Sequence, residues 1–246
     1  MLSLLKKKKT PLVNSIPPNY IDIHNHLIPG IDDGSKTFEE SLELITKMRS
    51  YGIKNFVCTP HIMDSVYNNT PQIINKKLNE LQAFIKSKGI TDVTIRAAAE
   101  YLLDANFENL LKEKELLTLK DNKILVELSY HNAPLNLYDI LFKIQIAGYQ
   151  PVLAHPERYA FYHKDMSAYK KMKEAGCLFQ LNLLSLTTYY GKEVQKVALK
   201  LLKEGLIDFV GSDTHHSRHL QALESINNRD IVKLITPILK KNEALI

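Results

Sequence analysis

Short apolar runs alternate with longer amphipathic segments along most of the 246-residue chain. The runs are rich in residues that favour β-structure, whereas apolar residues in the longer segments recur every three or four positions, as on one face of a helix. Strands are therefore predicted at residues 20–23, 55–61, 93–101, 123–129, 151–155, 177–182 and 209–213. Helices are predicted at residues 38–51, 71–88, 107–117, 135–147, 165–175, 194–202 and 230–244.

This regular alternation indicates parallel strands joined by crossover helices. Near-continuous apolar strands are typical of a sheet that is buried on both faces. Periodicity alone leaves two α/β architectures open, a closed barrel and an open doubly wound sheet. No shift in composition marks a second domain, so residues 20–246 are expected to form one domain. Residues 1–19, which contain a run of four lysines and three prolines, are expected to form an extended arm.

Acidic and imidazole side chains stand at or near the carboxyl ends of the predicted strands. The set consists of His24, His26, His61, Glu100, Glu127, His155, Asp213 and His215, with Asp32 in the loop after the first strand. Strand ends converge on one face of a barrel, where active sites of such folds lie, whereas an open sheet would spread these residues along a line. Any one of them alone is more often an ordinary loop or ion-paired side chain. Burying so many without a cation would be costly, so the set favours a barrel with a metal site.

The chemistry of these side chains restricts the metal. Imidazole and carboxylate without thiolate suit Mn, Fe or Zn rather than Ca²⁺ or a zinc-finger site. Nine candidate ligands exceed the capacity of one ion, so two or three ions that share bridging carboxylates are expected. Such a cluster lowers the pKa of bound water and clamps the oxygens of a phosphoryl group. Arg158 and Arg218 follow two of the same strands and are expected to bind phosphate oxygens.

Composition excludes several classes of protein. The chain is 45% hydrophobic and 24% charged, as in ordinary soluble proteins, and no apolar run approaches the roughly 20 residues that span a membrane. The net charge of +5 is mild and no aromatic-interleaved basic patch is present, so nucleic acid is not expected as a partner. The lysine run follows a short apolar stretch, the reverse of a secretory signal, so a cytoplasmic location is expected.

The two cysteines, Cys58 and Cys177, lie in apolar runs and are expected to be buried, reduced thiols. Neither is followed by an arginine six residues downstream. This spacing excludes the phosphate-binding loop of phosphatases that use a cysteine nucleophile.

The motifs taken in order resemble those of the polymerase and histidinol phosphatase (PHP) superfamily from about residue 20 to 225. They are His-Asn-His at 24–26, Thr-Pro-His at 59–61, Ala-Glu-Tyr at 99–101, Val-Glu-Leu-Ser at 126–129, Ala-His-Pro-Glu-Arg at 154–158 and Gly-Ser-Asp-Thr-His at 211–215. Residues 30–34, 100–101 and 155–158 are most similar to one branch, the manganese-dependent bacterial protein-tyrosine phosphatases of capsule and exopolysaccharide loci.

This resemblance implies a distorted (β/α)7 barrel of the PHP type, a single catalytic domain with metal ions at the C-terminal ends of its strands. Carried over by position, the first ion would be held by His24, His26, Glu100 and Asp213. Glu100 would bridge to a second ion completed by Glu127 and His155, and a third would be held by Asp32, His61 and His215. Mn²⁺ is the implied metal, with Fe or Zn as alternatives. The branch has a phosphate-binding arginine after the Asp-x-His motif, at a longer spacing than Arg218 has here.

The implied reaction is hydrolysis of phosphotyrosine on a cognate bacterial tyrosine autokinase that controls polysaccharide synthesis. A metal-bridging hydroxide would attack phosphorus in line, without a phosphoenzyme, while Arg158 neutralises charge on the equatorial oxygens. A metal-bound water, Asp33 or His215 would protonate the leaving tyrosinate. Two alternatives remain: a small-molecule phosphomonoesterase such as histidinol phosphatase, and a non-enzymatic scaffold that binds the kinase. Weak basic character disfavours a nuclease.

Overall fold

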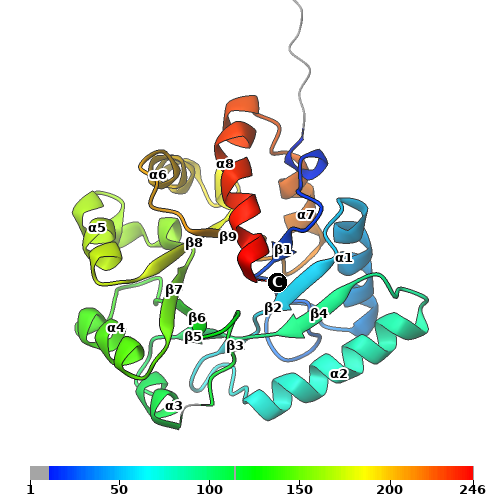
Figure 1. Cartoon of the computed structure of the whole chain (residues 1–246), viewed down its shortest axis with the longest axis horizontal. Helices are drawn as coiled ribbons and strands as arrows, with labels where there is room; N and C mark the ends of the chain where they lie inside the picture. The colour runs from blue at the N-terminus through cyan, green and yellow to red at the C-terminus, as the bar shows by residue number, and fades with distance from the viewer. Residues whose placement is uncertain (1–10, 114, 246) are drawn as a thin grey trace, which may run out of the picture.

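A ring of parallel strands, wrapped by helices, makes up the computed structural model, which describes residues 11–113 and 115–245 (Figure 1). The strands are β1 (Ile21–Asp22), β2 (Asn55–Cys58), β3 (His61–Ile62), β4 (Thr94–Ala97), β5 (Glu100–Leu102), β6 (Lys123–Glu127), β7 (Gln150–Ala154), β8 (Leu178–Asn182) and β9 (Phe209–Gly211). The α-helices are α1 (Phe38–Ser50), α2 (Pro71–Ser87), α3 (Phe107–Glu113), α4 (Leu137–Ile146), α5 (Met166–Glu174), α6 (Lys192–Lys203), α7 (Ser217–Glu224) and α8 (Arg229–Lys241). Short 3-10 helices are η1 (Leu12–Asn14), η2 (Pro156–Arg158), η3 (Ala160–Tyr162), η4 (Leu183–Leu186) and η5 (Asn242–Leu245).

The strands form two parallel sheets, in the orders β1-β2-β4 and β3-β5-β6-β7-β8-β9. Strands β2 and β3 are two parts of one predicted strand, interrupted at residues 59–60, and β4 and β5 are parts of another, interrupted at residues 98–99. Backbone hydrogen bonds from Ala98 N to Cys58 O (2.8 Å) and from Glu100 N to Pro60 O (3.1 Å) join these parts across the break. The nine strands therefore occupy the seven strand positions that the sequence predicts.

The ring closes between the first and last strands. Just beyond β1 and β9, Asn25 and Thr214 form a parallel bridge. Asp213 N donates to His24 O at 2.7 Å, and His26 N donates to Thr214 O at 2.9 Å. These bonds join the first sheet to the second at the carboxyl ends of the strands, as the predicted distorted α/β barrel requires.

At the opposite end of the same seam, the side chain of Asn242 replaces direct pairing of β1 with β9. Its Nδ2 donates to Ile21 O (3.0 Å) and Val210 O (2.7 Å), and its Oδ1 accepts from Val210 N (3.1 Å). Asn242 is fully buried, so these backbone groups have no access to water. The segment after α8 thus closes the barrel at the amino ends of its strands.

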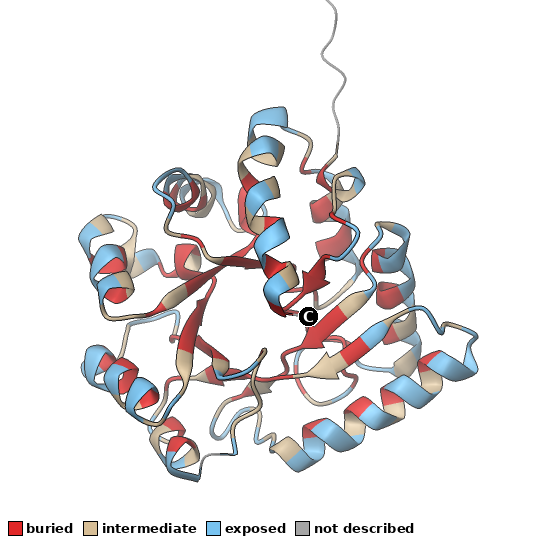
Figure 2. Ribbon diagram, in the orientation of Figure 1, coloured by how far each residue is buried: buried red, intermediate tan, exposed pale blue. Residues whose placement is uncertain are grey.

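Successive strand residues are buried on alternate faces. Val57, Leu125 and Val152 belong to an apolar cluster inside the barrel, whereas the neighbouring Phe56 and Leu153 belong to the larger cluster shared with the helices. The inner cluster consists of Ile21, Ile23, Val57, Ala98, Leu119, Leu125, Val152, Ala154, Phe209 and Leu245. Figure 2 shows the buried strands at the centre and the exposed outer faces of the helices. The near-continuous apolar strands are explained by this burial on both faces.

Local signals set most helix ends. The Thr37 side chain accepts from Glu40 N and begins α1, and the Thr70 side chain accepts from Ile73 N before the proline that opens α2. One predicted helix end was wrong, and one helix was not predicted. Helix α3 ends at residue 113 rather than 117, because the Tyr101 hydroxyl accepts from Leu117 N at 2.7 Å and draws the chain back to the barrel. Helix α7 was not predicted, because its eight residues are too few to show a clear helical repeat of apolar positions.

Part of the predicted N-terminal arm packs on the domain. Leu12 in η1 is buried, and its N–H donates to Ile226 O at 2.7 Å. Residues 1–10, including the lysine run, lie outside the described residues. No helix in the described part of the chain is long and apolar enough to cross a membrane. Both cysteines are buried and free, as expected.

The buried seam predicts the effect of removing Asn242. Asn242→Ala should lower the free energy of unfolding by about 2–3 kcal/mol, because three buried backbone groups lose their partners. The matched control is Asn109→Ala on the exposed side of α3, which should change stability by less than about 0.5 kcal/mol. Urea unfolding of the three proteins measures the difference. An equal, small change in both variants would show that the seam does not depend on this side chain.

Candidate metal centre

Two histidines just after β1 direct their Nε2 atoms toward the same point. His24 and His26 are fully buried, and their Nε2 atoms lie 3.4 Å apart. Each ring is held from behind at Nδ1, His24 by Gln180 Oε1 and His26 by Asp32 Oδ2, both at 2.7 Å. When Nδ1–H donates to these oxygens, each Nε2 presents a lone pair, which is the form that binds a metal.

Glu100, the first residue of β5, lies at the centre of the site. Its Oε2 lies 3.1 Å from His24 Nε2 and 3.3 Å from His61 Nδ1, and its Oε1 lies 3.0 Å from His155 Nε2. Burial alone would raise the pKa of Glu100, but the charges of His24 and His61 outweigh it and hold the pKa well below its usual range. The ionised carboxylate therefore has the placement of a bridging ligand.

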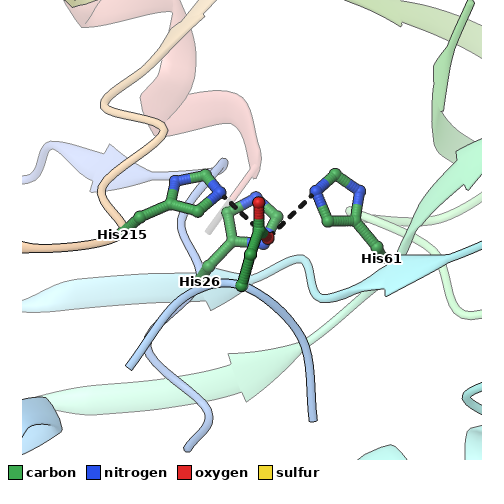
Figure 3. A group of neighbouring side chains, drawn as sticks. His26, His61 and His215 are labelled. Atoms are coloured by element: carbon green, nitrogen blue, oxygen red, sulfur yellow. Dashed lines mark ion pairs between the residues drawn. The ribbon is translucent and has the colours of Figure 1, made fainter. Parts of the chain in front are cut away.

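The potential ligand atoms form four overlapping groups, each with all atoms within 4.8 Å of one another. The groups are His24–His26–Asp213, His24–Glu100–His155, His61–Glu100–Glu127 and His26–Asp33–His61–His215. Figure 3 shows three of these rings, His26, His61 and His215, directed toward a common centre. Eight of the nine predicted ligands are thus brought together.

Unsatisfied buried atoms indicate that this cluster fits a cation. His61 Nδ1 and Glu127 Oε1 lie 3.0 Å apart, yet neither makes a hydrogen bond of good geometry within the described residues. His155 Nδ1 also has no hydrogen-bond partner there. Leaving such groups unpaired is unfavourable, whereas a metal ion would satisfy lone pairs that face one another.

The histidine pKa values reflect the surrounding carboxylates. Burial opposes charge on all three rings, but Glu100 raises the pKa of His24, and Asp32 raises that of His26. The negative charges of Glu100 and Glu127 raise the pKa of His61 to about 9. A bound cation would replace these protons as the positive charge that balances the carboxylates.

The geometry groups Asp33, rather than Asp32, with the other potential ligands. The Asp32 carboxylate accepts from Gly34 N at 2.9 Å and holds His26, so it orients a ligand and is absent from the four groups. Asp33 instead lies 3.5 Å from His61 Nε2 and 3.4 Å from His215 Nε2. The sequence of a loop does not fix the direction in which each side chain points, so it does not distinguish the roles of these two neighbouring aspartates.

Asp33 is also unsuited to donate a proton. Partial burial would raise its pKa, but the hydrogen bond to His215 and the charges of His215 and His61 hold the pKa well below its usual range. The side chain therefore stays ionised at neutral pH.

Arg158, in η2 after β7, lies beside the cluster. Its Nη1 donates to Asp213 Oδ2 at 2.9 Å, while Asp213 Oδ1 lies 3.3 Å from His24 Nε2. Arg158 is the one arginine or lysine among the residues that line a pocket of about 470 Å³ above the cluster. Arg218 is exposed on α7 and is not among them, so its predicted role gains no support from this arrangement.

Several residues of the site were not anticipated. Gln180 and Asn182 on β8 are fully buried; Gln180 holds His24, and Asn182 Nδ2 donates to Asp213 Oδ2 at 2.7 Å. Tyr130 and Tyr190 line the pocket. A signal was available for β8, because two polar residues interrupt an apolar run that ends at the same face as the ligands. The tyrosines lie in loops and carry no such signal.

Known proteins are similar to this chain in sequence and architecture. A family described as "Capsular polysaccharide synthesis, CpsB/CapC" matches residues 20–230. Tyrosine-protein phosphatase YwqE of Bacillus subtilis (strain 168) is 31% identical over 197 residues, which cover 80% of this chain and 77% of YwqE. Tyrosine-protein phosphatase CpsB of Streptococcus pneumoniae is 30% identical over 204 residues, covering 80% of this chain and 83% of CpsB.

A solved structure is similar to this chain over almost its whole length. It comes from work on YwqE of B. subtilis and CpsB of S. pneumoniae, described as unique metal-dependent tyrosine phosphatases, and has a TM-score of 0.82 at 28% identity. The similarity covers 92% of this chain and 93% of that one. The family match spans every strand of the barrel, and the resemblance predicted from the motifs is confirmed. The chain belongs to the CpsB/CapC family of capsular polysaccharide synthesis proteins.

Proposed function

We propose that this chain is a metal-dependent protein-tyrosine phosphatase. Its substrate would be phosphotyrosine on a bacterial tyrosine autokinase of a capsule or exopolysaccharide locus, and it would act in the cytoplasm. One observation carries the proposal: members of all four overlapping groups of potential metal ligands line the same pocket as a single arginine. Metal ligands beside an anion-binding arginine are the arrangement that hydrolysis of a phosphate monoester needs.

The residues of the four groups would hold two or three ions, with Mn²⁺ as the proposed metal. Imidazoles and carboxylates suit that ion, and Glu100, a carboxylate that belongs to two of the groups, is placed to be shared between ions. When bound, the ions supply an activated water and offset negative charge on the phosphoryl oxygens. Asp32 and Gln180 would keep His26 and His24 in the ligating orientation.

Arg158 would bind the phosphate oxygens, with Asp213 fixing its position. The leaving tyrosinate has a pKa near 10 and is a fair leaving group, so the reaction does not require a proton donor from the chain. Asp33 is therefore no longer proposed as the acid, because its carboxylate stays ionised. His215 Nδ1 lies 2.9 Å from Asp213 O; if that nitrogen carries the proton, Nε2 is free to act as a ligand.

The walls of the pocket favour an aryl phosphate over a small polar phosphate. Tyr67, Tyr130, Tyr189 and Tyr190 line it above the ligands. Tyr189 is 42% exposed, so aromatic surface is available where a phosphotyrosine ring would enter, whereas Tyr130 and Tyr190 lie against Arg158.

A phosphatase assay tests the function directly. Protein stripped with chelator should release no phosphate from a phosphotyrosyl peptide, and titration with Mn²⁺ should restore release, with histidinol phosphate turned over at least about 100-fold less efficiently. Glu100→Gln should lower kcat/KM by about 100-fold or more, because it removes a shared ligand. Glu43→Gln, on the exposed side of α1, is the matched control. Preference for histidinol phosphate, or release without metal, would contradict the proposal.

The different placement of the two neighbouring aspartates predicts different metal stoichiometries. Asp33→Asn should lose one bound ion per chain, because it removes a member of a ligand group. Asp32→Asn should keep the number of ions and weaken their binding by about 10- to 100-fold, because it only loosens His26. Equilibrium dialysis with metal analysis measures both quantities. Loss of an ion in Asp32→Asn with none lost in Asp33→Asn would restore the assignment expected from the sequence.

The raised pKa of His61 predicts how stability depends on pH. The folded-state pKa of about 9 exceeds the ordinary 6.5, so its protonation stabilises the metal-free fold fully below about pH 6.5, and this contribution is lost as pH rises through 9. Chelated protein should therefore lose thermal stability over this range, and saturating Mn²⁺ should remove most of the loss by replacing the proton. His131→Gln, at an exposed histidine, should leave both profiles unchanged. Parallel melting profiles with and without Mn²⁺ would rule out this exchange.

A further inference from the structure

The guanidinium of Arg158 lies against two aromatic rings. Its Cζ is 4.2 Å from the centroid of the Tyr190 ring and 4.8 Å from that of Tyr130. Tyr130 comes from the loop after β6, and Tyr190 from the loop between η4 and α6, so two distant parts of the chain supply the two rings. Each contact falls within the range of a cation–π interaction.

Each ring is itself held in place. Tyr130 stacks on His155, with ring centroids 5.8 Å apart and planes inclined by 22°. The Tyr190 hydroxyl accepts from Asn182 Nδ2 at 3.3 Å. Asn182 Nδ2 also donates to Asp213 Oδ2, the atom that accepts from Arg158. Asn182 thereby links the ring on one side of the guanidinium to the carboxylate at its edge.

The guanidinium is therefore restrained in two ways. The two rings limit the space into which the guanidinium can move, and the Asp213 carboxylate holds one of its N–H groups. Within residues 11–113 and 115–245, that carboxylate is the one hydrogen-bond acceptor of Arg158. The other N–H groups remain available to an anion in the pocket that Arg158 lines.

We propose that Tyr130 and Tyr190 are positioning residues, which hold Arg158 in the position where its remaining N–H groups meet the oxygens of the bound phosphate. An unrestrained arginine loses side-chain freedom when it binds an anion, whereas a restrained one loses less. The inference rests on the proposed function, because it assigns a role within the same site. The rings act through Arg158 and not on the substrate.

The hydroxyl groups of the two tyrosines have a smaller part in this role than their rings. Burial and the nearby Asp213 carboxylate raise the pKa of Tyr190, so the phenol stays neutral and its ring keeps the electron-rich face that attracts a cation. Replacing either tyrosine with phenylalanine should thus preserve most of the effect, and replacing it with leucine should remove it.

The test measures binding of inorganic phosphate to the Mn²⁺-loaded protein by calorimetry, with kcat/KM on a phosphotyrosyl peptide in parallel. Tyr130→Leu and Tyr190→Leu should each weaken phosphate binding and lower kcat/KM by about tenfold, and the phenylalanine variants should stay within about threefold of the wild type. Tyr138→Leu on α4, a half-exposed tyrosine outside the pocket, should match the wild type. Mn²⁺ affinity should be unchanged in all of them.

A double-substitution experiment separates positioning from direct contact with the substrate. In an Arg158→Met background, the two leucine substitutions should have no further effect on phosphate affinity, because there is no guanidinium left to hold. A further loss in that background, or equal losses with leucine and phenylalanine, would overturn the proposal. So would leucine variants of wild-type affinity. If Tyr190→Leu does not fold, Tyr130→Leu and both phenylalanine variants give the same decision.

The phosphate measurement does not depend on turnover. If the wild type binds phosphate but does not hydrolyse the peptide, the proposed function fails while the effect of the leucine variants on affinity still decides the role of the tyrosines. If the peptide is hydrolysed and the variants behave like the wild type, only the positioning role fails.

Discussion

The closure of the barrel between β1 and β9 is the constraint on which the site depends. The hydrogen bond from Asp213 N to His24 O brings the ligands of the first and last strands within 3.4 Å of each other. Gly211 permits this approach, because a Cβ there would lie 2.4 Å from His24 Cβ. Buried Asp22 strengthens the seam by accepting from Ser212 N and Oγ at 2.8 and 2.7 Å. Burial raises the pKa of Asp22 to about 6 even though these hydrogen bonds work against the rise.

The sequence contained enough information for the barrel and for most of the site. Ligands such as His61, Glu100 and His155 follow apolar runs, and the geometry of a parallel barrel brings the ends of such runs together whatever the details of packing. The tertiary prediction therefore needed only local signals. The breaks at residues 59–60 and 98–99 were not predicted, because each apolar run was taken as one continuous strand.

The features that the sequence did not resolve share a physical cause. Asp32 and Asp33 are chemically identical neighbours, and only the loop conformation decides that one holds His26 while the other faces His61. Tyr130 and Tyr190 are 60 positions apart and meet only because both loops reach Arg158. Residues that position another side chain leave no spacing pattern in the sequence. The motifs therefore indicate the candidate ligands but not the residues that orient them.

Backbone conformation at the strand ends shows how the fold is adapted to its site. His155 and Asp213 both have left-handed backbone, with φ of 35° and 50°, directly after β7 and near the end of β9. This conformation costs a non-glycine residue roughly 1–3 kcal/mol and persists only where the surroundings impose it. Here His155 N donates to Gln180 O and Asp213 N to His24 O, each at 2.7 Å, so the next strand in the ring holds the strained residue. The sharp turn at His155 also starts η2, which carries Arg158 to the Asp213 carboxylate. The potential metal ligands and Arg158, the arginine proposed to bind phosphate, are therefore placed by the same local strain, and a variant that relaxed it would gain stability while separating Arg158 from the candidate metal centre.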